Sequence, residues 1–119
     1  MNVYKIYQVR NDDKKIFREF SFNSLDSILR GHPECRGELP QLPREAWVHI
    51  YSYVTEKEPS LDWLFLLFNR AEGKGNVPDM PEDLYGHSMS VSDIVEYPDG
   101  RLWFCDSLGW KEIEWEAGS

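Results

Sequence analysis

The sequence predicts an α+β fold, a single compact domain in which an antiparallel sheet of about five to six strands packs against two or more helices. Short segments rich in β-branched and aromatic residues recur along the chain, which is typical of strands. Two apolar stripes at helical spacing each follow a serine that can cap a helix. The chain has 119 residues, 41% of them hydrophobic, which suits one hydrophobic core. We therefore expect residues 1–116 to form the domain and residues 117–119 to fray.

The N-terminal residues predict a hairpin followed by a short helix. Residues 3–9 and 16–22 are rich in strand-forming types, and the Asn-Asp-Asp sequence at 11–13 between them signals a turn. Asn23 or Ser24 can then cap a helix that ends at Gly31.

The middle of the chain predicts one buried strand and one apolar helix. Residues 31–45 are irregular, and residues 46–54 are apolar or aromatic on both faces, so we place this strand centrally in the sheet. Ser60 can cap a helix over residues 61–70, in which Leu66 falls on the polar side.

The C-terminal residues predict a loop and then a meander of three strands. Residues 71–86 contain three glycines and two prolines, which favours a surface loop. The expected strands are residues 92–97, 101–106 and 110–115, joined by turns at 98–100 and 107–109.

The net charge of −8 bears on the class of partner. It results from 21 acidic against 13 basic residues. Binding to a phosphate backbone needs a basic surface, so we expect no direct contact with nucleic acid. No apolar run reaches the roughly 20 residues that a membrane span needs, so we expect no membrane partner either. The acidic excess favours solubility, and its alternative interpretation is a surface that imitates DNA.

The cysteine content favours a reducing compartment. Cys35 and Cys105 form no C-x-x-C pair, and the N-terminus runs directly into a predicted strand without a signal peptide. A secreted domain of this size usually carries more cysteine. We expect a cytoplasmic protein with free thiols, although the sequence leaves a disulfide between the two cysteines open.

The most distinctive motif reads Gly-His-Ser-Met-Ser-Val-Ser-Asp over residues 86–93, followed by Asp-Ser-Leu-Gly at 106–109. It resembles the YodL-like domain family, whose members carry a Gly-His-Ser-Leu-Ser-Val-Ser-Asp run and then Asp-Ser-Phe-Gly. The opening residues 3–8 and the Pro-Glu-Asp-Leu-Tyr-Gly stretch at 81–86 are also similar to that family. The resemblance implies a cytoplasmic bacterial domain without an established activity. It also implies frequent association with mobile elements, which favours a host-modulating role.

The motif invites a hydrolase interpretation, with His87, Ser88 and Asp93 as its members. A nucleophilic serine needs a strained turn and an oxyanion hole, and the sequence has no Gly-x-Ser-x-Gly elbow. If the run is extended, its serines share one side, and Asp93 can accept backbone amides at a strand entry. We then expect Asp93→Ala to destabilise the fold by about 1–3 kcal/mol. The residues expected to hold structure or to bind a partner are Gly86, His87, Ser88, Ser90, Ser92, Asp93, Asp106, Ser107 and Gly109.

These patterns favour a protein-interaction domain over an enzyme. We assign no catalytic residue, no cofactor and no metal site, because the closest ligand spacing, at residues 32–35, offers fewer ligands than a metal site uses. The expected partner is a protein of unknown identity, and the oligomeric state stays open. The candidate partner surface consists of Leu66, Trp110 and Trp115. Glu112, Glu114 and Glu116 alternate along a strand, which suits either a DNA mimic or a charged edge strand.

Overall fold

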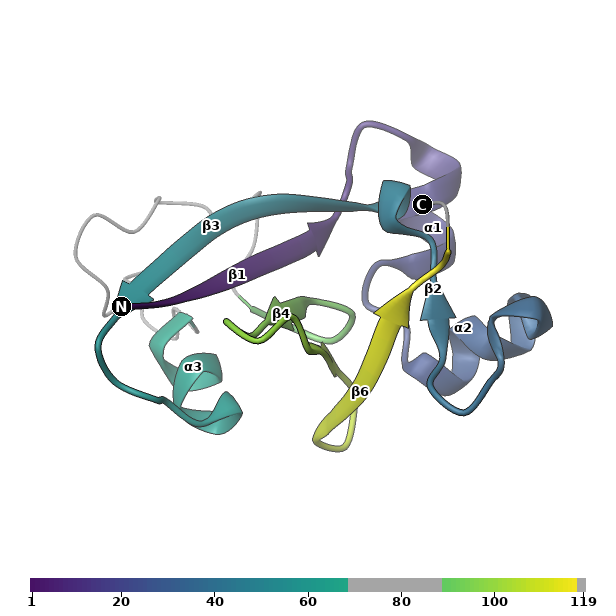
Figure 1. Ribbon diagram of the computed structural model, residues 1–119. Coiled ribbons are helices and arrows are strands. Elements are labelled where there is room, and N and C mark those ends of the chain that lie inside the picture. The colour runs from purple at the N-terminus through teal and green to yellow at the C-terminus, as the bar shows by residue number, and fades with distance from the viewer. Residues whose placement is uncertain (69–88, 118–119) are drawn as a thin grey trace.

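The computed structural model describes residues 1–68 and 89–117, which form a mixed sheet flanked by helices (Figure 1). The strands are β1 (Asn2–Val9), β2 (Gln41–Leu42), β3 (Trp47–Thr55), β4 (Ile94–Glu96), β5 (Leu102–Cys105) and β6 (Trp110–Trp115). The helices are α1 (Lys14–Phe20), α2 (Leu25–Gly31) and α3 (Leu61–Phe68), with short 3-10 turns η1 (Pro33–Cys35) and η2 (Arg44–Ala46). The loop expected at 71–86 lies outside the described residues.

The sheet has the strand order β2-β6-β5-β4-β1-β3. Every neighbouring pair is antiparallel except β2 and β6, where Gln41 and Leu42 run parallel to Glu114 and Trp115. The α+β class is confirmed, but the prediction of an antiparallel sheet holds only approximately. The strand at 3–9 and the C-terminal meander are also confirmed.

The expected second strand at 16–22 is wrong, because α1 covers most of it. Asp13, predicted to lie in a turn, is the N-cap of α1, and its Oδ1 accepts the backbone N–H groups of Lys15 and Ile16. Ile16 and Phe20 are four positions apart, so they lie on one helix face and both contact the core. The tertiary packing of this face overrides the strand preference of its aromatic and β-branched residues.

The prediction that residues 46–54 form a central strand is also wrong. β3 stands at one end of the sheet order, beside β1 only. Both of its faces are apolar because a separate core lies on each side of the sheet. Trp47 belongs to one core, while Ile50 and Tyr53 pack against the other. The pairing with β1 shifts register between Ile6 and Tyr7.

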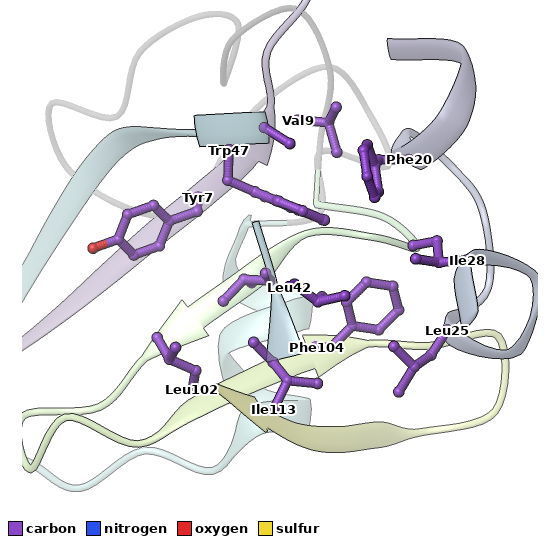
Figure 2. Packing of buried hydrophobic residues seen from close by; sticks show 12 residues of the cluster. Tyr7, Val9, Phe20, Leu25, Ile28, Leu42, Trp47, Leu102, Phe104 and Ile113 are labelled. Atoms are coloured by element: carbon purple, nitrogen blue, oxygen red, sulfur yellow. The ribbon is translucent and has the colours of Figure 1, made fainter. Parts of the chain in front are cut away.

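The two cores give the domain its layers. One face of the sheet packs against α1 and α2, with Phe20, Leu25 and Ile28 directed toward Trp47 and Phe104 (Figure 2). The other face packs against α3, through Leu64 and Phe68. Ser24 and Ser60 cap α2 and α3, as the sequence predicts. Within the described ranges, no helix has the length and apolar character to cross a bilayer.

Candidate functional site

Residues 90–93 form a tight turn, so the condition under which the serines would share one side, an extended run, is not met over these residues. The Asp93 backbone N–H donates to the Ser90 carbonyl at 3.1 Å, and Ser92 has φ +84°. A positive φ at the third position is what a type II turn requires, and glycine usually supplies it. The side chain of Asp93 closes the turn, because its Oδ2 accepts the Ser90 backbone N–H at 2.9 Å.

The same residues form a bulge where β4 meets β5. Ser92 donates its backbone N–H to the Cys105 carbonyl, and Cys105 donates its own to the Asp93 carbonyl, both at 2.8 Å. Ser92 and Asp93 on one strand therefore lie opposite Cys105 alone on the other. Ser92, the first of the two, has a left-handed backbone conformation, which is the pattern of a G1 bulge. Serine stands where glycine is favoured, so its side chain must compensate for backbone strain.

The Ser92 side chain and carbonyl join three parts of the chain. Ser92 is 1% exposed. Its Oγ accepts the backbone N–H of Phe22 at 2.9 Å, in the connection between α1 and α2. Its carbonyl accepts the Trp47 indole N–H at 2.8 Å. Glycine and alanine, which have no side-chain acceptor, could not make the contact to Phe22.

Asp93 is fully buried beside uncharged groups. Its Oδ2 also accepts the side-chain N–H of Gln8 on β1 at 3.0 Å. No donor in the described ranges reaches its Oδ1. Burial raises the pKa of the Asp93 carboxyl well above its ordinary value, although the Ser90 and Gln8 donors lower it. A proton on Asp93 therefore suits this site better than a charge.

Asp106 connects the β5–β6 turn to α2. Its Oδ1 accepts the backbone N–H groups of Leu25 at 3.2 Å and Ser107 at 2.8 Å. Its own backbone N–H donates to the Gly109 carbonyl, and Gly109 has φ +78°. This part of the motif thus positions the first turn of α2, where a carboxylate is favourable.

Of the three residues of the hydrolase interpretation, only Asp93 lies among the described residues. Gly86, His87 and Ser88 lie outside the described residues. Burial raises the pKa of Asp93, which makes this carboxyl poorly suited to orient and stabilise a protonated histidine. Across residues 1–68 and 89–117, no group of three His, Cys, Asp or Glu side chains is arranged to hold a metal ion.

Both thiols are buried and free. Burial, followed by the Glu116 carboxylate, raises the pKa of Cys35 to about 11. Burial is the main cause that raises the pKa of Cys105 to about 12. A nucleophilic cysteine needs a lowered pKa, so neither thiol is activated.

The predicted partner surface does not form one patch. Trp110 packs with the α3 core, whereas Trp115 packs with the α1 and α2 core on the opposite face. Trp115 is also covered by the Arg44 guanidinium, 5.4 Å from its ring. Leu66 lies in α3, but its side chain is outside what the structure describes.

A different surface carries one exposed aromatic side chain, Trp63, beside the half-buried Tyr97 and the buried Tyr4, and sequence reasoning missed it. A hollow of about 350 Å³ lies among the start of β1, the β3–α3 connection and the β4–β5 turn. A second hollow, of about 320 Å³, lies beside it, and both are lined by Glu58 and Pro59. Trp63, 44% exposed, lines the second hollow. We call the surface formed by Tyr4, Glu58, Pro59, Trp63 and Tyr97 the aromatic surface.

One sequence signal could have indicated this surface. Prolines follow Glu58 and Tyr97 in two separate connections, and Trp63 departs from the main apolar stripe of its helix. Only the strand order brings these connections together, because β1 lies next to both β3 and β4.

The fold and these sites define a small α+β domain in which the described part of the motif, residues 90–93 and 106–109, forms internal contacts. A family model described as a YodL-like domain matches residues 3–115, and the chain belongs to that family. No curated protein and no solved structure matches the chain.

Proposed function

We propose that this chain is a non-enzymatic protein-interaction domain that binds its partner through the aromatic surface. The observation that carries this proposal is the exposure of Trp63. This large aromatic side chain is 44% exposed and lines a hollow. Tryptophan and tyrosine are the residues that dominate binding energy at protein interfaces. A neighbouring hollow then gives a partner side chain a place to insert.

The internal role of the motif also supports a binding function. The side-chain oxygens of Ser92, Asp93 and Asp106 accept hydrogen bonds from backbone N–H groups and from Gln8. We propose that these residues stabilise the fold and do not act on a substrate. The family resemblance supports a cytoplasmic location and a host-modulating role, and a partner from the bacterial host is the corresponding proposal.

The alternative, a DNA mimic, has less support. A mimic presents a row of unpaired carboxylates, but Glu114 accepts the Gln41 amide N–H and Glu116 accepts the Cys35 thiol. Salt distinguishes the two functions. Raising salt from about 0.1 M to about 1 M shortens the screening length from about 10 Å to about 3 Å, which would release a mimic from its target. An aromatic interface should stay bound.

Co-purification from a native host tests the proposal, with the wild-type chain, Trp63→Ala and Phe22→Ala as baits. Phe22, 51% exposed near α1 and α2, is the matched control for an exposed aromatic side chain. We expect Trp63→Ala to weaken a captured partner by about 30-fold, as for an interface residue worth about 2 kcal/mol, and Phe22→Ala to retain it. Equal retention by both variants, with unchanged circular dichroism, would contradict the proposal.

A further inference from the structure

We propose that a hollow beside α1 binds a phosphate monoester carried by an aromatic ring, with Lys14, Arg18 and Ser21 holding the phosphate and Phe17 contacting the ring. The hollow has a volume of about 450 Å³, and its lining residues are Asn11, Lys14, Phe17, Arg18 and Ser21. It lies at the opposite end of β1 from the aromatic surface (Figure 1), so this inference is independent of the proposed function.

The spacing of the lining residues places them on one side of α1. Lys14, Phe17 and Arg18 stand at positions i, i+3 and i+4, which are neighbours on a helix surface, and Ser21 is the C-cap one turn further on. Lys15, next to Lys14 in the sequence, lines a separate hollow. The helix therefore directs Lys14 and Arg18 to one shared surface and Lys15 to another.

The charge of this hollow is positive, although the chain as a whole carries a net charge of −8. None of its lining residues is a carboxylate. The acidic residues nearest in sequence are engaged elsewhere, namely Asp12 in an ion pair with Arg10, Asp13 as the cap of α1, and Glu19 in contact with His32. Neither Lys14 nor Arg18 forms an ion pair with any described carboxylate. Like charges four positions apart destabilise a helix, and an anion bound between them would remove this repulsion.

A buried hydroxyl without a partner is the second feature that indicates a ligand. Ser21 is 8% exposed, and no group in the described ranges forms a hydrogen bond with its Oγ. Buried polar groups are nearly always hydrogen-bonded, because an unpartnered one costs free energy. Serine rotates about a single side-chain torsion, which lets its hydroxyl turn to an occupant. Since Ser21 lines the hollow, an oxygen atom of that occupant would supply the missing partner.

The donors in the hollow match a phosphate better than a carboxylate. Lys14 and Arg18 supply two positive charges, whereas a phosphate monoester carries a charge of about −1.5 to −2 at neutral pH and has three strong acceptor oxygens. A carboxylate has only one charge and two oxygens. The Ser21 hydroxyl and the Asn11 amide add uncharged donors to the same hollow. A nucleic-acid backbone needs a wider basic surface, so a single phosphate is the better match.

The aromatic wall suits a ring on the group that carries the phosphate. The rings of Phe17 and Phe22 meet edge to face, with centroids 6.2 Å apart and an interplanar angle of 82°. Phe22 has φ +60°, which is unusual for a bulky residue, and Ser92 Oγ accepts its backbone N–H at 2.9 Å. This hydrogen bond holds Phe22 in place beside Phe17. A ligand ring that packs against Phe17 would therefore meet a wall that is already formed.

Titration of the ¹⁵N-labelled full chain, followed by amide chemical shifts in NMR spectra, tests the inference. The probes are phenyl phosphate, adenosine monophosphate, inorganic phosphate and phenol. We expect both monoesters to bind more tightly than inorganic phosphate and to shift residues 11–22 most, and we expect phenol alone not to bind. Of the two monoesters, the tighter one identifies the source of the phosphate as a phosphorylated phenol or as a nucleotide.

Four variants, each with its fold checked by circular dichroism, test the residues of the hollow. Lys14→Gln and Arg18→Gln should each weaken phenyl phosphate binding about fivefold, and the control Lys15→Gln should leave it unchanged. Ser21→Ala should weaken binding by a similar factor without lowering the melting temperature of the free chain, because the lost hydroxyl has no partner there.

Four results would overturn the inference: no shift with either monoester, equal affinity for inorganic phosphate and the monoesters, equal affinity of Lys14→Gln and Lys15→Gln, or full binding by Ser21→Ala. None of them bears on the proposed function, because Trp63 lies at the other end of β1 and is tested with a protein partner.

Discussion

Two substitutions of the buried Asp93 test two different properties. Alanine tests whether the fold needs a hydrogen-bond acceptor at this position, and asparagine tests whether the side chain is uncharged. Alanine removes the acceptor that Asp93 offers to the fully buried Gln8 side chain and to the part-buried Ser90 backbone N–H. Loss of a hydrogen-bond partner costs a buried donor about 1–3 kcal/mol, so Asp93→Ala should destabilise the fold by about that amount. Asparagine keeps an acceptor oxygen and carries no charge, so it should be tolerated near neutral pH.

The pH dependence follows from the raised pKa of Asp93 in the folded state. Below the unfolded pKa of about 3.9, the carboxyl is protonated in both states and contributes no pH dependence. Above that value the unfolded chain loses its proton while the folded chain keeps it, which favours unfolding. The contribution to stability is therefore lost as pH rises toward the folded pKa, by up to about 1.4 kcal/mol per pH unit.

Urea unfolding followed by tryptophan fluorescence measures this effect, since Trp47 is buried in the core. The difference in the free energy of unfolding between Asp93→Asn and the wild type should increase in favour of the variant as pH rises from about 4. Subtracting the two curves removes the contribution of every other titrating group. A difference that stays flat with pH would contradict a raised pKa of Asp93 in the folded protein.

Three further predictions concern backbone strain and thiol reactivity. Ser92→Ala keeps the strained φ of +84° and loses the hydroxyl, so thermal unfolding should show it about 1 kcal/mol less stable than Ser92→Gly; equal stability would refute the strain. Gly109→Ala should destabilise the fold by about 1–2 kcal/mol because of its φ of +78°. Gly31 has equally free space around it but lies in a helix, so Gly31→Ala should stabilise the fold by up to about 1 kcal/mol. Urea titrations measure both, and effects of the same sign would exclude backbone conformation as the cause. Cys35 and Cys105 should react with a thiol reagent near neutral pH only as fast as the chain unfolds, and fast labelling of the native protein would contradict their raised pKa values.

Short-range sequence patterns correctly predicted those helices and strands in which the packing agrees with the structural preference of the residues. The strand at the N-terminus, the serine caps and the C-terminal meander depend on short-range signals, and the structure contains them. The helix α1 was missed because its aromatic residues favour strands, while the cap at Asp13 resembles a turn in sequence. The position of β3 was missed because a strand covered on both faces has the same composition at the edge as in the centre.

The candidate sites were less predictable because they depend on long-range placement. Nothing local indicates that Ser92 adopts a positive φ, since its hydroxyl finds its partner 70 positions away. The aromatic surface likewise combines two connections that only the strand order makes neighbours. Residue types identified Asp93 as a candidate acceptor, but the structure was needed to show which groups surround it.

The position of β1 between β3 and β4 determines when the chain can finish folding during synthesis. Gln8 and Asp93 are 85 positions apart, so a ribosome adding about 5–20 residues per second separates their synthesis by roughly 4–17 s. Once β3 has been made, β1 can pair with it, but the other edge of β1 has no strand to pair with until β4 is made. The nascent chain therefore exposes an aromatic strand edge, which a chaperone or a second nascent chain can bind before β4 arrives.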